Sequence, residues 1–169
     1  MAVELTTSQA SCPTAVVNAP ADVVWGLLTE PAGWGDFFDV RITRVQPTGP
    51  AAVGQRIYAE SGPRLLHLKL EFEYLAINAD HYRLILNVRL PFGITVREDL
   101  NCVPLQRNQC RVNYRCNFGF PKGWRGAVAR LAMYRELDAG PVDSLSRLKR
   151  AAERRHQPTA LVDAGQRGH

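Results

Sequence analysis

The amino-acid sequence predicts an α+β fold: a curved antiparallel sheet of about seven strands around one long C-terminal helix, with two short helices after the first strand. Between residues 40 and 118, apolar side chains recur at every second position, the period of half-buried strands. From residue 127 to residue 155 they recur at helical spacing. Because a sheet with one solvated face must cover its apolar side, we expect the long helix to pack there, and a cavity can remain between them.

The N-terminal segment predicts a strand at residues 11–18 and a helix at residues 20–30. Pro20 suits the first turn of that helix, and Pro31 ends it because a residue before proline avoids the helical region. A second short helical turn follows and carries Trp34, Phe37 and Phe38. These aromatic side chains either line the mouth of a cavity or pin the turn to the sheet edge.

The middle of the chain predicts a run of hairpins. Segments rich in turn residues separate the alternating stretches, so consecutive strands are expected to be antiparallel. The expected strands cover residues 40–46, 54–61, 66–77, 82–90, 94–102 and 110–118.

The C-terminal helix is expected over residues 127–155. Gly140 and Pro141 interrupt it, which predicts a kink or two abutting helices because proline lacks a backbone donor. We expect residues 1–157 to form one domain and residues 158–169 a disordered tail.

The chain of 169 residues has a net charge of +5 and a pI of about 9.3. Its arginines are spread along the sequence and alternate with apolar residues among acids such as Glu71, Glu73 and Asp99. This pattern favours a solvated mixed-charge face over a nucleic-acid site, and it leaves open a docking face for an acidic protein partner. The sequence shows neither a signal peptide nor a membrane span, so a cytoplasmic location is expected, and a homodimer stays open.

The cysteines and histidines predict neither a metal site nor a nucleophile. No two of the four cysteines have C-x-x-C spacing, and three of them, Cys102, Cys110 and Cys116, fall on the apolar side of their strands, so we expect them buried and reduced. His67 and His81 are expected at the surface. We therefore expect no metal and no cofactor.

One acidic residue interrupts the apolar series of the strand at residues 94–102. In this segment Glu98 shares its side with Ile94, Val96, Leu100 and Cys102. Burial would raise the pKa of its carboxyl, which could then act as an acid or base or bind a ligand hydroxyl. Two alternatives remain: a structural hydrogen bond or ion pair, and a bulge that turns the side chain to solvent.

Several strings of the sequence resemble a known superfamily. They are "VVNAPADVVWGLLTEPAGWGDFF", "AVGQRIYAES" and "CRVNYRCNFGFP…DSLSRLKRAAE", and the likeness extends over residues 11–155. The chain resembles the START-like or SRPBCC (helix-grip) superfamily, in its polyketide cyclase/dehydrase and lipid-transport branch. The resemblance implies a helix-grip fold that binds a hydrophobic small molecule between sheet and helix. It implies no shared catalytic triad.

We therefore expect a carrier or sensor for a lipid, polyketide or isoprenoid-like ligand. The first alternative is a polyketide cyclase or dehydratase with Glu98 as its acid and base. The second is a protein-interaction module that uses the basic outer face of the sheet. The residues expected to contact the ligand are Tyr114, Tyr134, Trp34, Phe38, Leu70, Phe72, Leu86, Val96 and Leu131.

Overall fold

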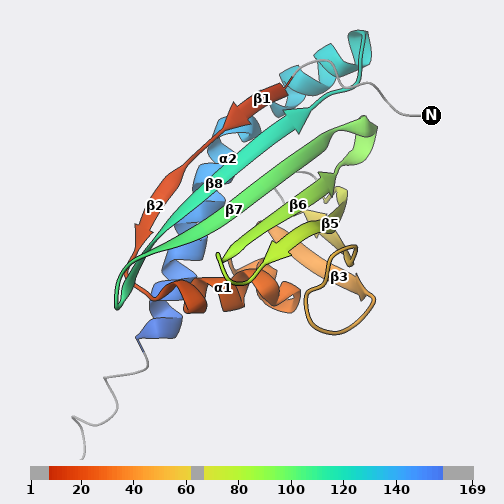
Figure 1. The fold of residues 1–169 in the computed structure, drawn as a ribbon. Coiled ribbons are helices and arrows are strands. Elements are labelled where there is room, and N and C mark those ends of the chain that lie inside the picture. The colour runs from red at the N-terminus through yellow and green to blue at the C-terminus, as the bar shows by residue number, and fades with distance from the viewer. Residues whose placement is uncertain (1–7, 62–66, 158–169) are drawn as a thin grey trace, which may run out of the picture.

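The computed structural model of the protein describes residues 8–61 and 67–157, without the side chains of residues 8, 9, 132, 134–136 and 138 (Figure 1). The predicted helix-grip architecture is confirmed. Within the described residues, eight strands form one antiparallel sheet, and the long C-terminal helix packs across it. The tail expected at residues 158–169 lies outside the described part of the chain.

The elements follow the predicted order. They are β1 (Ser8–Ser11), β2 (Thr14–Val17), α1 (Ala21–Thr29), the 3-10 helix η1 (Pro31–Asp36), β3 (Val40–Gln46), β4 (Arg56–Ser61), β5 (Lys69–Asn78), β6 (Arg83–Arg89), the short turn η3 (Pro91–Gly93), β7 (Thr95–Gln106), β8 (Gln109–Gly119) and α2 (Trp124–His156). The strands lie in the order β1-β8-β7-β6-β5-β4-β3, and β2 also pairs with β8. No helix among the described residues is long and apolar enough to cross a membrane.

The N-terminal strand differs from the prediction. Instead of one strand, the chain forms β1 and β2, which both pair with β8. Pro13 lies between them, and it has no N–H to donate to a strand ladder. Its carbonyl still accepts a hydrogen bond from the backbone N–H of Tyr114 at 3.0 Å, so the break is local.

The long helix differs from the prediction at its start, and at Pro141 one of the two predicted alternatives is excluded. It begins at Trp124, earlier than expected, and it continues through Pro141, so the alternative of two abutting helices is wrong. Burial explains why the lost hydrogen bond is tolerated, since most helical stability in proteins comes from packing of an apolar face. The buried side chains on both sides of the proline include Leu137, Leu145, Leu148 and Ala152.

The core under the sheet contains the aromatic residues of η1. Trp34 is fully buried, and its Nε1 donates to the carbonyl oxygen of Leu28 at 3.2 Å. The hydroxyl of Tyr74 donates to the same oxygen at 3.0 Å. Edge-to-face contacts join the Trp34 ring to Phe38 and Phe72. Trp34 therefore anchors η1 to the sheet. For this residue, the alternative in which the aromatic side chains pin the turn to the sheet is the one that applies.

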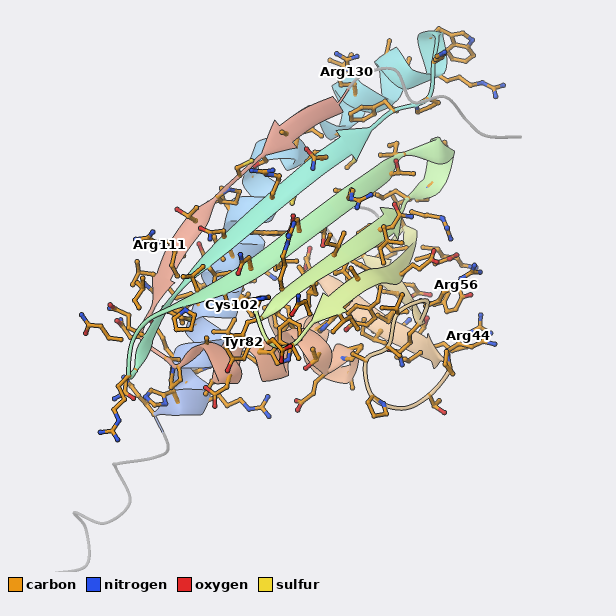
Figure 2. The ribbon with its side chains drawn as sticks, in the orientation of Figure 1. Arg44, Arg56, Tyr82, Cys102, Arg111 and Arg130 are labelled. Atoms are coloured by element: carbon orange, nitrogen blue, oxygen red, sulfur yellow. The ribbon has the colours of Figure 1, made fainter. Side chains whose placement is uncertain are left out.

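The outer face of the sheet carries charged side chains of both signs. Figure 2 shows Arg44, Arg56 and Arg111 at the periphery of the molecule. Strand neighbours pair several of these charges, which agrees with the solvated mixed-charge face expected from the sequence. The ion pairs are Arg41–Glu60, Arg56–Glu71, Arg83–Asp99, Arg89–Glu71 and Arg89–Glu73.

Candidate functional site

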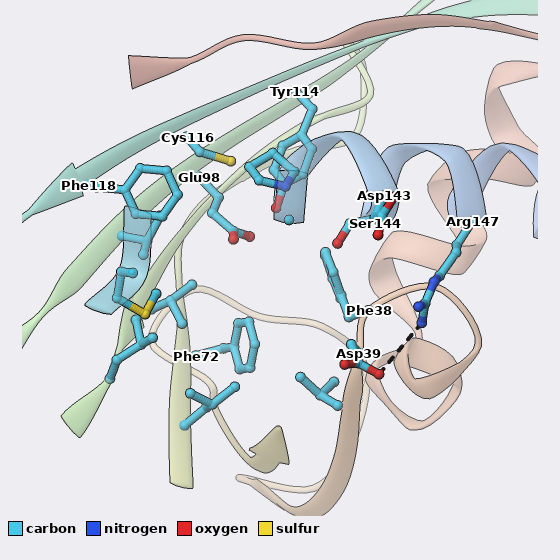
Figure 3. Close-up of a pocket in the computed structure, with 18 residues that line it drawn as sticks. Phe38, Asp39, Phe72, Glu98, Tyr114, Cys116, Phe118, Asp143, Ser144 and Arg147 are labelled. Carbon is cyan, nitrogen blue, oxygen red and sulfur yellow. Dashed lines mark ion pairs between the residues drawn. The ribbon is translucent and has the colours of Figure 1, made fainter. Parts of the chain in front are cut away.

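A cavity of about 140 Å³ lies between the sheet and α2 (Figure 3). Strands β5 to β8 supply its wall, α2 closes it on the other side, and the segment after η1 borders it. Most of the lining is apolar. The apolar lining residues are Phe38, Val40, Leu70, Phe72, Val88, Leu90, Val96, Phe118 and Met133.

Glu98 points into this cavity from the middle of β7 (Figure 3). Its register partners are Leu86 on β6 and Cys116 on β8. The irregularity of this strand pair lies further along, between Pro104 and Gln106, so no bulge turns Glu98 to solvent. The side chain is only 8% exposed. Its Oε2 atom is buried and has no hydrogen-bond partner among the described residues.

Burial raises the pKa of Glu98 from its usual 4.5 to about 7, and a hydrogen bond with Tyr114 acts in the opposite direction. The pKa of the Tyr114 phenol rises well above its usual range, mainly through burial and then through the Glu98 charge. Burial likewise raises the pKa of the Cys116 thiol. At neutral pH the tyrosine and the cysteine therefore keep their protons, whereas Glu98 can hold or release one.

The mouth of the cavity is polar. Asp39 follows η1, and its Oδ1 atom lies 3.6 Å from Nη1 of Arg147 on α2 (Figure 3). Asp143 and Ser144 lie one turn earlier on the same helix and also line the cavity. This group was not identified from the sequence. A signal was present, because Gly140, Ser144 and Arg147 recur at helical spacing.

The structure brings six of the predicted site residues to the cavity: Phe38, Leu70, Phe72, Val96, Glu98 and Tyr114. Trp34 and Leu86 are fully buried in the core beside it. Leu131, which was expected to contact the ligand, does not line the cavity, and its side chain is 80% exposed. The side chain of Tyr134 lies outside the described part of the structure. Whether any of these residues contacts a ligand stays a prediction.

The cysteines and histidines lie as expected. Cys102, Cys110 and Cys116 are buried and free, and Cys12 is free and exposed. His67 and His81 are exposed. In the described ranges, no group of three or more His, Cys, Asp and Glu side chains could hold a metal ion.

Residues 7–153 match the family model described as "Polyketide cyclase / dehydrase and lipid transport". The chain belongs to this family. The match covers both sides of the cavity, from β1 to the last turns of α2. No curated protein is matched by this chain in sequence.

Solved structures share the fold of this family member. The aromatase/cyclase Zhui from Streptomyces sp. R1128 is 17% identical, with a TM-score of 0.75 over 91% of this chain and 99% of that one. Norcoclaurine synthase from Thalictrum flavum, in complex with dopamine and hydroxybenzaldehyde, is 13% identical, with a TM-score of 0.64 over 89% of each chain. The di-domain ARO/CYC BexL of the BE-7585A pathway is 16% identical, with a TM-score of 0.65 over 86% of this chain and 46% of that one.

Proposed function

We propose that the protein binds a small, largely apolar molecule in the cavity and holds a polar group of that molecule on Glu98, as a carrier or sensor. The observation that carries the proposal is the buried Oε2 atom of Glu98, which faces the cavity without a hydrogen-bond partner among the described residues. Buried polar groups are normally paired, so this oxygen is suited to a ligand hydroxyl.

The size of the cavity limits what it can enclose. An apolar cavity of roughly 150 Å³ is large enough for benzene. The 140 Å³ cavity therefore suits one ring of a ligand, while a longer molecule would extend past the polar mouth at Asp39 and Arg147. The apolar lining supplies affinity, and Glu98 supplies the preference for a donor group.

Phenol and toluene test this proposal because they have nearly the same shape and differ by a hydroxyl against a methyl group. A hydrogen bond to a charged group contributes about 1.5–3 kcal/mol. Above neutral pH, where Glu98 is charged, phenol should therefore bind the wild-type protein at least about tenfold more tightly than toluene does. The variant Glu98→Leu should lose that preference, and Asp99→Asn, on the opposite face of β7, should keep it. NMR titration of each probe measures both affinities. Equal affinities in the wild-type protein would contradict the role of Glu98.

A second candidate function is a polyketide cyclase or dehydratase, and the pKa of Glu98 favours it. A group with a pKa of about 7 can both remove and donate a proton at neutral pH. In such a reaction the carboxylate would remove a proton from a carbon next to a carbonyl, and the resulting acid would protonate the departing hydroxyl. Tyr114 beside it could hold the carbonyl oxygen.

A poly-β-ketone substrate distinguishes the two candidates. If the protein is an enzyme, Glu98→Gln should lower kcat by roughly 10²–10⁴-fold, as expected for loss of a general acid or base. The control Asp99→Asn should retain activity. Full turnover in Glu98→Gln would rule out the acid–base role, and a wild-type protein that binds the probes without turnover would support the carrier or sensor.

A further inference from the structure

The first turns of α2 expose apolar side chains to solvent. Trp124 is 74% exposed, Val128 58% and Leu131 80%, and spacings of four and three residues place them on one side of the helix. Phe92, in η3 between β6 and β7, is 78% exposed. We call these four residues the apolar rim.

The two parts of the apolar rim are neighbours in space. A Cβ atom added at Gly93, next to Phe92, would lie 3.9 Å from the ring of Pro121, just before α2. On α2, Met133 lines the cavity, and Leu131, two positions before it, is exposed on the opposite side of the helix. The rim is therefore one surface patch outside the cavity.

Two glycines fix the start of α2. Gly123 precedes the helix with a φ of 81°, a conformation that other residues rarely adopt. The backbone N–H of Gly126 donates to the carbonyl oxygen of Gly123 at 3.1 Å. A Cβ atom at position 126 would lie only 1.8 Å from the carbonyl oxygen of Pro121. Only glycine therefore fits at position 126, where the first turn of α2 packs against the incoming chain.

The rim has positive charge around it. Residues 121–135 contain one lysine, three arginines and no acidic residue. Lys122, Arg125 and Arg130 are exposed, and the Arg125 guanidinium lies 5.6 Å from the centre of the Trp124 ring. An exposed tryptophan among cations at a helix end is typical of segments that lie in a membrane interface.

We propose that the apolar rim docks the protein on an anionic lipid bilayer. Four protruding side chains offer an apolar patch of only a few hundred Å², below the roughly 800 Å² per partner of a stable protein interface. A bilayer needs no matching surface, and it attracts each nearby lysine or arginine. The proposal does not rest on the proposed ligand, since docking requires only the rim and its cations.

Flotation of the full-length protein with phosphatidylcholine vesicles, with and without phosphatidylserine, tests the proposal. Binding should require phosphatidylserine and should weaken between about 0.1 M and about 1 M salt, as screening increases. Trp124→Ser with Leu131→Ser should lower the partition coefficient at least about tenfold, because two large apolar side chains leave the interface. Arg125→Gln should lower it about fivefold. The matched control is Val53→Ser, which removes an exposed apolar side chain outside the rim.

Three results would overturn the proposal: no binding to phosphatidylserine vesicles, binding that the rim variants do not change, or a homodimer that dissociates in the Trp124→Ser and Leu131→Ser variant. The last would assign the rim to a second copy of the chain. Circular dichroism establishes that the variants are folded. Phenol titration of the same preparations, without vesicles, reports separately on the cavity, so failure of docking and failure of ligand binding remain distinguishable.

Discussion

Glu98 and Asp99 are consecutive carboxylates on β7, yet they lie on opposite faces of the sheet. Glu98 faces the cavity, where burial raises its pKa to about 7. Asp99 faces outward, where a hydrogen bond and the charge of Arg83 lower its pKa. Its two oxygens accept from Arg83 Nε at 2.9 Å and Nη2 at 2.7 Å. Two consecutive positions on one strand thus carry a carboxyl suited to ligand chemistry and a carboxyl that stabilises a solvated surface, because successive side chains point to opposite faces.

The two carboxylates should have opposite effects on stability as pH changes, and Glu98 should have the larger one. In the folded protein its pKa is about 7, against 4.5 when unfolded. From about pH 4 to about pH 8 the unfolded chain therefore loses this proton first, and the free energy of unfolding falls by about 3 kcal/mol on account of Glu98.

Glu98→Gln should remove that loss. Urea denaturation across this pH range should show the variant gaining about 3 kcal/mol relative to the wild-type protein as pH rises. The comparison within each protein across pH cancels the constant cost of a buried amide. A variant with the wild-type pH profile would mean that Glu98 ionises as it does in water.

The second prediction compares tyrosines on the two faces. Tyr74→Phe removes a buried hydroxyl that donates to the Leu28 carbonyl at 3.0 Å, and should lower the free energy of unfolding by about 1 kcal/mol. The matched change is Tyr58→Phe on β4, where the ring lies 4.2 Å below the Arg44 guanidinium and keeps that contact without its hydroxyl. Thermal denaturation of both variants should show a loss only for Tyr74. Equal losses would contradict the assignment of the two faces.

The alternation that separates these faces was predictable from the sequence. The strand at residues 94–102 placed Glu98 inward from local periodicity alone, and burial in the structure agrees. The helix was harder, because apolar residues of α2 occur on more than one side. Ala129, Met133 and Leu137 are buried at intervals of four residues, whereas Leu131, two positions from Ala129 and from Met133, is 80% exposed. Apolar spacing alone therefore did not show which side of α2 the sheet covers.

The polar mouth could not be predicted because its members meet only in the folded chain. Asp39 and Arg147 are separated by most of the sequence, and no local pattern relates them. The break at Pro13, in contrast, had a signal in the sequence, because proline cannot donate to a strand ladder. On both sides of Pro13, β1 and β2 pair with β8 in one register.

The third prediction concerns the neighbour that opposes the raised pKa of Glu98. Tyr114→Phe removes the hydrogen bond that lowers this pKa, so the pKa of Glu98 should move upward. The hydrogen bond contributes about 1 kcal/mol, and its loss should make the carboxyl titrate at higher pH. NMR titration of the side-chain carboxyl measures the shift directly. The control is Tyr82→Phe, on the same side of the sheet but away from the cavity, which should leave the pKa of Glu98 unchanged.

The smallest effect is expected on the solvated face. Asp99→Asn removes the charge that pairs with Arg83, an ion pair whose two side chains remain partly exposed. Such pairs contribute little, so we expect a decrease in Tm of about 1 °C that shrinks further in high salt. Because the pKa of Asp99 is lowered in the fold, this contribution is present above its unfolded pKa of 3.8 and is lost as pH falls, opposite to Glu98. Calorimetry at two salt concentrations and two pH values measures it. Two results would mean that Asp99 is buried and that the two faces of β7 do not differ as described. One is a loss of about 3 kcal/mol in Asp99→Asn at neutral pH, as large as the effect expected for Glu98. The other is a loss that salt leaves unchanged.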